Sequence, residues 1–293
     1  MSAISAPDID WSLARRIGLW TGGELPAVSR SEAARETASL RLAAFEARDL
    51  VARQFGPPGL RHDVAVVDRE GWRAGAESMV EGFVAAMGLV RRRRRWLTPV
   101  RRAAFGMAVG IGLGVAGRQL LGQYDPLGRR LFLVAPTIYA TRHRHGIGAG
   151  DFHLWVCLHE QTHAAQFAAA PWLRDHFVGL LMQAADGKRL NDTLALMTFL
   201  EGHADLVTDR AAARRISSVA ALRTAFRRPA GPRRRGLWGA LDKSAQYRDG
   251  LAFCRAATKR RRHALNAAFE DPANLPTLDE IANASAWLER VHG

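Results

Sequence analysis

The chain has 293 residues, 48% of them hydrophobic, which is enough to bury a substantial core and excludes a chain that is disordered throughout. Two cysteines, Cys157 and Cys254, cannot build a disulfide framework, so a disulfide-rich secreted domain is excluded and a reducing cytoplasm is favoured. The 42 lysines and arginines outnumber the 28 acidic residues, and the resulting formal charge of +14 attracts anionic partners.

The N-terminal part of the chain is predicted to be helical. Its first ten residues lack a basic region followed by an apolar core, so we expect no secretory signal. Ser29-Arg-Ser-Glu32 is a capping box that predicts a helix running to about Phe55, before the Gly-Pro-Pro-Gly turn. Residues 61–68 are expected to be a short strand or a loop, and residues 72–90 a second helix.

Residues 103–117 form an uncharged segment with five glycines. The segment is shorter than the roughly twenty residues that a membrane-spanning helix needs. It therefore predicts a buried helix packed closely against another helix. The alternative is a membrane-surface segment anchored by the arginines at positions 91–95, 101 and 102.

The clearest predicted strand covers residues 130–135, after a turn at residues 124–128. We expect it to be an edge strand beside a cleft, where it could pair with an extended peptide. An apolar helix follows, with Asp151 as its N-cap, and it ends before Pro171.

This helix contains the sequence His159-Glu160-Gln161-Thr162-His163. Residues four apart lie on the same face of a helix, so both imidazoles can reach one Zn²⁺. Glu160 lies one step round the helix and can face a metal-bound water as a general base. The spacing predicts a zinc hydrolase.

Catalytic zinc usually takes three protein ligands, and the best third candidate is Glu201 in a second apolar helix. Asp205, four residues later, could receive the N–H of a ligating imidazole and fix its orientation. His203 is the rival ligand, but it points about 200° away from Glu201 on the helix, so only one of the two can face the metal.

Other polar residues have simpler interpretations. Histidines in apolar helices are usually hydrogen-bonded core residues, which is what we expect of His153, His176 and His203. Cys157 is expected to be a small buried residue. A donor to a developing oxyanion is left unassigned among His203, Tyr247 and Arg248.

Basic residues cluster at positions 91–102, 227–235 and 259–262. Such clusters attract nucleic acid, anionic membranes or acidic proteins, although solvated loops are the simpler interpretation. No zinc-finger spacing, RNA-binding motif or phosphate loop accompanies them, so no specific nucleic-acid recognition is predicted.

The remaining elements are predicted to be helices over residues 172–185, 192–213, 217–227 and 241–269. A second capping box, Thr277-Leu-Asp-Glu280, predicts a C-terminal helix. The fold class is therefore mainly α (α+β), with a small sheet beside the metal helix. We expect an N-terminal helical segment over residues 1–60 and a metal-binding domain over residues 61–293, unless the two form one continuous domain.

The sequence resembles the gluzincin-like metallopeptidases, which pair H-E-x-x-H with a downstream E-x-x-x-D. More closely it resembles a zincin-like family labelled zinc-dependent metalloprotease, some members of which are labelled as associated with deazaflavin coenzyme biosynthesis. The matching stretches lie between about residue 75 and the C-terminus: Leu121-Gly-Gln-Tyr-Asp-Pro126, Leu131-Phe-Leu-Val-Ala-Pro136, residues 151–167, Glu201-Gly-His-Ala-Asp205, Leu241-Asp-Lys243, Gln246-Tyr247 and Asn274-Leu-Pro-Thr-Leu-Asp-Glu-Ile281.

The resemblance implies a zincin-like helical domain with metal at His159, His163 and Glu201 and with Glu160 as the catalytic carboxylate. We predict a cytoplasmic zinc metallopeptidase, peripheral to a membrane if the basic clusters bind an anionic surface. It would hydrolyse a peptide or amide bond of an unidentified peptide or protein by means of a zinc-activated water. The alternatives are a catalytically silent zinc-binding scaffold and a basic adaptor for anionic membrane or nucleic acid. The oligomeric state is not predicted.

Overall fold

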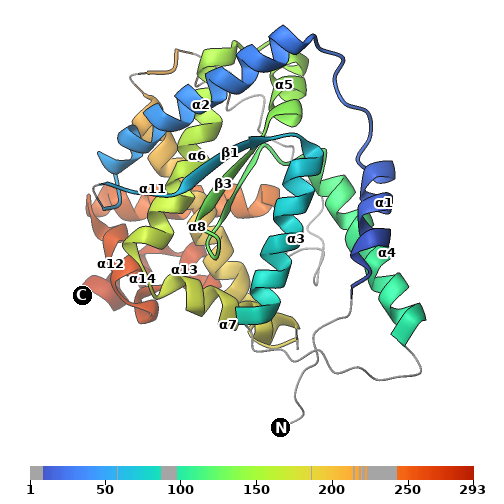
Figure 1. The fold of residues 1–293 in the computed structure, drawn as a ribbon. Helices are drawn as coiled ribbons and strands as arrows, with labels where there is room; N and C mark the ends of the chain where they lie inside the picture. Colours follow the sequence, from blue (N-terminus) through green and yellow to red (C-terminus); the bar gives the residue numbers. More distant parts are fainter. Residues whose placement is uncertain are drawn as a thin grey trace. The chain divides into compact units, whose positions relative to one another are not determined.

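The computed structural model describes residues 9–57, 59–86, 98–185, 187–213, 215–217, 219, 222 and 243–293. Helices dominate this part of the chain, together with one three-stranded sheet (Figure 1). The predicted mainly α class with a small sheet is therefore confirmed. The chain forms two compact units, Met1–Leu42 with His62–Ala149 and Ala43–Arg61 with Gly150–Gly293. The predicted domain division at residue 60 stays a prediction.

The first unit contains the sheet and the helices that pack on it. Its elements are α1 (Trp11–Thr21), the first part of α2 (Arg30–Ala52), β1 (Asp63–Val67), α3 (Arg69–Ala86), α4 (Thr98–Gly117), β2 (Gly122–Asp125), β3 (Arg130–Val134) and α5 (Ala135–Arg144). Ser29 caps α2 as predicted, because its hydroxyl accepts a hydrogen bond from the amide of Glu32 at 3.2 Å.

Strand β3 lies in the middle of the sheet, parallel to β1 and antiparallel to β2. The prediction that this strand is an edge strand is wrong, since both of its sides are already hydrogen-bonded and cannot accept a peptide strand. The continuous apolar run that made the strand easy to predict is typical of a central strand. Leu131 and Leu133 are fully buried, and Phe132 packs against Trp72 of α3.

The glycine-rich segment forms a helix packed closely against another one, as predicted, but the prediction that this helix is buried is wrong, since Met107, Ile111 and Val115 are exposed. An added Cβ at Gly106 or Gly110 would lie 2.6 Å from a backbone carbonyl oxygen of Asp10 or Ala14, respectively, so α1 and α4 approach each other at the level of their backbones. Figure 1 shows the two helices side by side. Across the described ranges, no helix combines the length and the apolar character needed to cross a membrane.

The second unit is entirely helical where the structure describes it. Beyond the end of α2 it contains α6 (Ala149–Ala169), α7 (Leu173–Ala185), α8 (Leu190–Ala212), α11 (Lys243–Arg260), η1 (Ala264–Asn266), α12 (Ala267–Glu270), η2 (Pro272–Asn274), α13 (Leu278–Ala282) and α14 (Ala284–His292). The capping box of Thr277 and Glu280 is present at the start of α13. Asp151 is not an N-cap, because α6 starts two residues earlier and places Asp151 in its first turn.

Several predicted features fall on residues that the structure does not describe. These are most of the predicted helix 217–227, the basic cluster 227–235 and the arginines at positions 91–95. The basic residues at positions 259–262 are described and exposed, as expected of a solvated surface.

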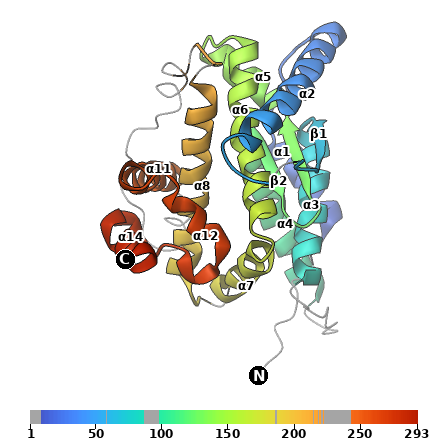
Figure 2. The ribbon, with the colours of Figure 1, turned by 90° about the vertical axis from the view of Figure 1, so that its left-hand side faces the viewer.

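Helices α8 and α11 cross with their backbones in contact (Figure 2). An added Cβ at Gly202 would lie 2.0 Å from the carbonyl carbon of Gly250, and an added Cβ at Gly250 would lie 2.0 Å from the carbonyl oxygen of Thr198. The core on either side of this crossing is aromatic, with Phe199, Phe253 and Trp287 all buried. The contact therefore fixes the position of Glu201, the residue before Gly202, relative to α11.

Replacing Gly202 by Ala is expected to destabilise the protein by about 1–3 kcal/mol or more, because no side chain can yield where two backbones touch. Thermal unfolding should show a melting temperature several degrees lower. Gly179→Ala in α7 is the matched control, since an added Cβ there meets nothing within 4 Å and helical alanine is favoured over glycine by about 0.5–1 kcal/mol. Equal melting temperatures for the two variants would contradict the backbone contact.

Candidate metal centre

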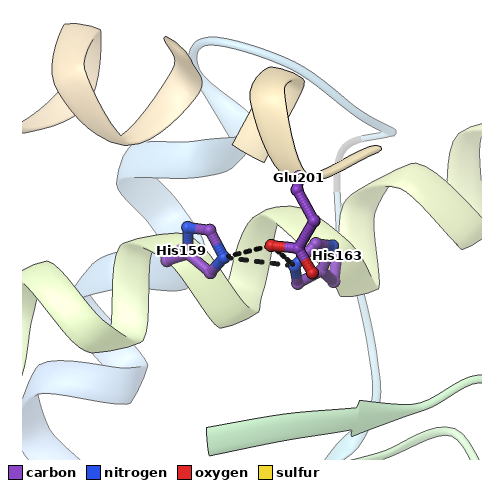
Figure 3. Close-up of side chains that lie close together, drawn as sticks. All are labelled: His159, His163 and Glu201. Atoms are coloured by element: carbon purple, nitrogen blue, oxygen red, sulfur yellow. Dashed lines mark hydrogen bonds and ion pairs between the residues drawn. The ribbon is translucent and has the colours of Figure 1, made fainter. Parts of the chain in front are cut away.

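Two helices of the second unit bring three metal-binding side chains together. His159 and His163 lie one turn apart on α6, and Glu201 reaches them from α8 (Figure 3). Their nearest ligand atoms all lie within 4.8 Å of one another. The side chains of His159, His163 and Glu201 keep 10%, 15% and 15% of their exposure, so the cluster is nearly buried but not sealed.

The spacing of the donor atoms fits a tetrahedral ion. Nε2 of His159 lies 3.2 Å from Oε2 of Glu201 and 3.3 Å from Nε2 of His163, and the remaining distance, from His163 to Glu201, is 3.7 Å. Zinc binds such atoms at about 2.0–2.2 Å with tetrahedral angles, which places neighbouring donors about 3.3 Å apart. The donor set therefore has the size that zinc requires.

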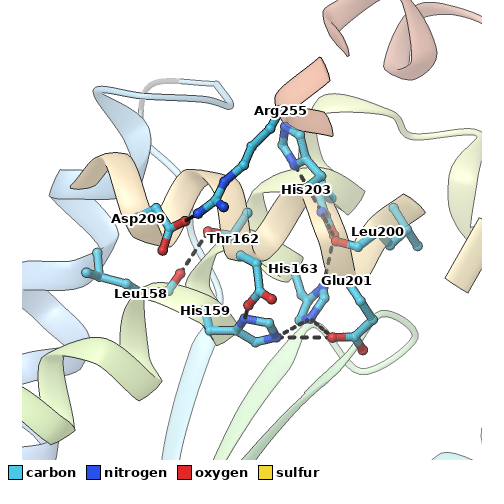
Figure 4. Close-up of polar contacts among 11 residues, drawn as sticks. Leu158, His159, Thr162, His163, Leu200, Glu201, His203, Asp209 and Arg255 are labelled. Carbon is cyan, nitrogen blue, oxygen red and sulfur yellow. Dashed lines mark hydrogen bonds and ion pairs between the residues drawn. The ribbon is translucent and has the colours of Figure 1, made fainter. Parts of the chain in front are cut away.

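Acceptor atoms of neighbouring side chains face Nδ1 of both imidazoles, and the two Nε2 atoms face the same place. Nδ1 of His159 lies 3.2 Å from Oδ1 of Asp205, and Nδ1 of His163 lies 2.9 Å from Oε1 of Gln166. Figure 4 shows both imidazoles beside Glu201, with His203 pointing away from them. Both partners accept, so each Nδ1 can keep its proton while each Nε2 would offer a lone pair to a bound ion. Two such lone pairs and a carboxylate at close range are satisfied by a cation.

The electrostatics of the cluster favour positive charge. Burial by itself would lower the pKa of His159, but the carboxylates of Asp205 and Glu201 together hold it well above its ordinary value. Burial would likewise raise the pKa of Glu201, yet pairing with His159 and His163 holds it well below the usual range. A centre that attracts a proton so strongly also attracts a metal ion, and the ion would displace that proton.

Gln166 connects the two helices behind His163. Its Nε2 donates to the carbonyl oxygen of Leu200 at 2.9 Å and lies 3.1 Å from Nδ1 of His203. Because the Leu200 carbonyl can only accept, the amide nitrogen of Gln166 must face it, which leaves Oε1 for His163. Gln166 is fully buried, so this orientation is fixed.

His203, the rival third ligand, turns into the core. Its ring lies 4.5 Å from the ring of Phe55 and 5.0 Å from that of Phe269. Burial lowers its pKa to about 3, so it stays neutral. The expectation of a hydrogen-bonded core histidine is confirmed.

The other predicted residues are placed as follows. Asp205 lies beside His159 as expected, and Glu160 is buried on α6 with 9% of its surface exposed. Cys157 is fully buried, which raises its pKa. Of the possible oxyanion donors, Arg248 is exposed and the side chain of Tyr247 lies outside the described residues. The link through Gln166 escaped sequence analysis, although its position three residues after His163 is a usable signal.

Replacing Gln166 by Leu is expected to weaken zinc binding by about 10- to 100-fold, because His163 loses the acceptor that fixes its proton and ring orientation. Competition with a fluorescent chelator measures this affinity. Gln183→Leu in α7, where the amide of an exposed glutamine donates to the carbonyl oxygen of Gly179 in the same helix, is the matched control and should bind zinc like the wild type. Unchanged affinity in a folded Gln166 variant would contradict the positioning role.

Comparison with known proteins gives two matches. A family model described as zincin-like metallopeptidase matches residues 9–194 and 181–288, ranges that together include all three donor residues. A crystal structure described as that of a proposed hydrolase with a novel fold, from Chloroflexus aurantiacus, has 27% sequence identity and a TM-score of 0.73, covering 96% of this chain and 98% of that one. No protein with a curated description matches the chain.

Proposed function

Because the chain belongs to the zincin-like metallopeptidase family, we propose that it is a zinc-dependent hydrolase of peptide or amide bonds. The observation that carries the proposal is the convergence of His159, His163 and Glu201 at the spacing of a tetrahedral ion. Three protein ligands leave a fourth position, which is the arrangement of catalytic rather than structural zinc.

His159, His163 and Glu201 would hold the ion. A bound zinc ion supplies a Lewis acid, which makes a water molecule acidic near neutral pH and polarises the scissile carbonyl. Asp205 and Gln166 hold the protons on Nδ1 of the two imidazoles and keep each Nε2 directed at the same point. The residues that orient the ligands thus come from both α6 and α8.

Glu160 is the proposed general base. It follows His159 directly on α6, and its carboxylate would accept the proton of the attacking water. The same carboxyl group would then donate that proton to the nitrogen of the leaving amine. One residue therefore serves as base and then as acid, as the H-E-x-x-H pattern implies.

Elemental analysis combined with a cleavage assay tests the proposal. Freshly purified protein is expected to contain about one zinc ion per chain and to cleave members of a diverse peptide library, with mass spectrometry locating the cut bonds. A chelator should abolish cleavage and added zinc should restore it. Stoichiometric zinc with no cleavage would instead favour a silent zinc-binding scaffold, and absence of zinc binding would overturn both.

A further inference from the structure

Helix α4 exposes an apolar face. Met107, Ile111 and Val115, on successive turns, keep 48%, 44% and 45% of their exposure. Residues 103–117 contain no charged or hydrogen-bonding side chain, so the face has no polar residue over four turns. Solvent-facing sides of helices in globular proteins are normally polar, and a continuous apolar stripe marks a binding surface.

The end of helix α1 extends this face. Ile17 and Thr21 contact α4 at Gly110 and Gly114, so Trp20, three residues after Ile17, borders the same part of α4. Trp20 is 83% exposed, and its neighbour Leu19 is 53% exposed. A tryptophan placed this way is typical of proteins that sit at a lipid–water interface, where the indole occupies the headgroup level.

The backbone under Trp20 is firmly held. Nη1 of Arg73 donates to the carbonyl oxygen of Gly18 at 3.2 Å, and Nη1 of Arg69 donates to that of Gly22 at 2.9 Å. These buried guanidinium groups satisfy carbonyls at the C-terminal end of α1. The exposed tryptophan is therefore presented by an ordered turn.

The charge of this part of the chain indicates which kind of partner binds the apolar face. Arg102 and Arg118, near the two ends of α4, are exposed, and the chain as a whole carries a formal net charge of +14. A second copy of the chain would bring the same positive charge to the face and be repelled. An anionic membrane combines an apolar interior, in which the exposed side chains can be buried, with negatively charged headgroups that attract the arginines.

We propose that the α1–α4 pair docks onto anionic membranes, with Met107, Ile111, Val115 and Trp20 entering the interface and with Arg102 and Arg118, at the two ends of α4, contacting lipid headgroups. The helices lie in the plane of the interface rather than across it. This surface contains none of the residues of the metal centre, so the result of a membrane-binding experiment does not bear on the proposed hydrolase activity.

Sedimentation with lipid vesicles tests the proposal on the full-length protein. The protein is expected to bind vesicles of phosphatidylcholine with phosphatidylglycerol, to bind pure phosphatidylcholine far less, and to dissociate as salt is added. Replacing Met107 and Ile111 together by Gln should weaken partitioning by about tenfold or more. Leu42→Gln, a leucine of α2 with 72% exposure, is the matched control and should partition like the wild type. Thermal unfolding verifies that both variants fold.

A labelled cysteine reports insertion directly. Both native cysteines are buried, so Ile111→Cys can be labelled selectively with an environment-sensitive dye. Anionic vesicles should shift its emission to the blue. Absence of this shift, or vesicle binding that ignores the double substitution, would overturn apolar docking. Sedimentation velocity that shows a dimer of the wild type and a monomer of the double variant would also overturn it, by assigning the face to a second copy.

Discussion

Replacing Glu160 by Gln is expected to lower kcat by about 10²–10⁴-fold and to leave the zinc content unchanged. The amide keeps the size of the side chain but cannot accept the proton of the attacking water. Since Glu160 is not among the three clustered donors, the metal centre should stay intact. Cleavage of a peptide selected from the library, together with elemental analysis of the same sample, measures both quantities.

Glu270→Gln is the control for this substitution, because Glu270 is an exposed glutamate of the same unit on α12. Its turnover should match that of the wild type. Wild-type turnover by the Glu160 variant would remove Glu160 from the mechanism, whereas loss of zinc together with turnover would show that the residue acts on the metal centre instead.

Replacing Glu201 by Gln is expected to weaken zinc binding by at least about 10²-fold and to abolish hydrolysis. The substitution removes the anionic donor 3.2 Å from Nε2 of His159, and a neutral amide cannot balance the charge of the ion in a nearly buried site. Chelator competition with the wild type and the variant, at one pH and ionic strength, gives the ratio of affinities.

Asp205→Asn provides the matched comparison, because it changes the carboxylate that accepts from Nδ1 of His159 rather than a donor to the ion. Its loss of affinity should be smaller, about 10- to 100-fold. If Asp205→Asn weakened zinc binding more than Glu201→Gln, the assignment of the third ligand to Glu201 would be wrong.

Part of the candidate centre could be predicted because it depends on spacings of four residues within a single helix. Helical periodicity alone places His159 and His163 on one face and puts Glu201 on the same side as Asp205. Helix geometry also shows that Glu201 and His203 cannot both face the metal, although it does not choose between them. What periodicity cannot supply is the contact between helices, so the bridge from Gln166 to Leu200 and the burial of His203 against Phe55 required the structure.

The fold was less fully predictable than the centre. The family resemblance is confirmed by the match of the zincin-like metallopeptidase model, while the association with deazaflavin coenzyme biosynthesis stays a prediction. Strand β3 was recognisable from its apolar run, but its place in the sheet depends on pairing between distant segments, and the predicted edge position is wrong. Helix α5 was missed because its ten residues follow directly from β3 and carry only a weak apolar pattern.

The backbone contact between Gly202 and Gly250 bears on which ions the centre can accommodate. Close-packed protein interiors are hard to compress, so a ligand-bearing helix cannot easily shift where its main chain is already in contact with another. Here α8 rests against main-chain atoms one residue from Glu201, so the glutamate's Cα cannot move towards α11. Adaptation to ionic radius must come from rotation within the glutamate side chain or from the imidazoles of α6. The backbone of Glu201 is therefore fixed on the side of α11, whereas the glutamate side chain and the imidazoles of α6 can adjust to the ion.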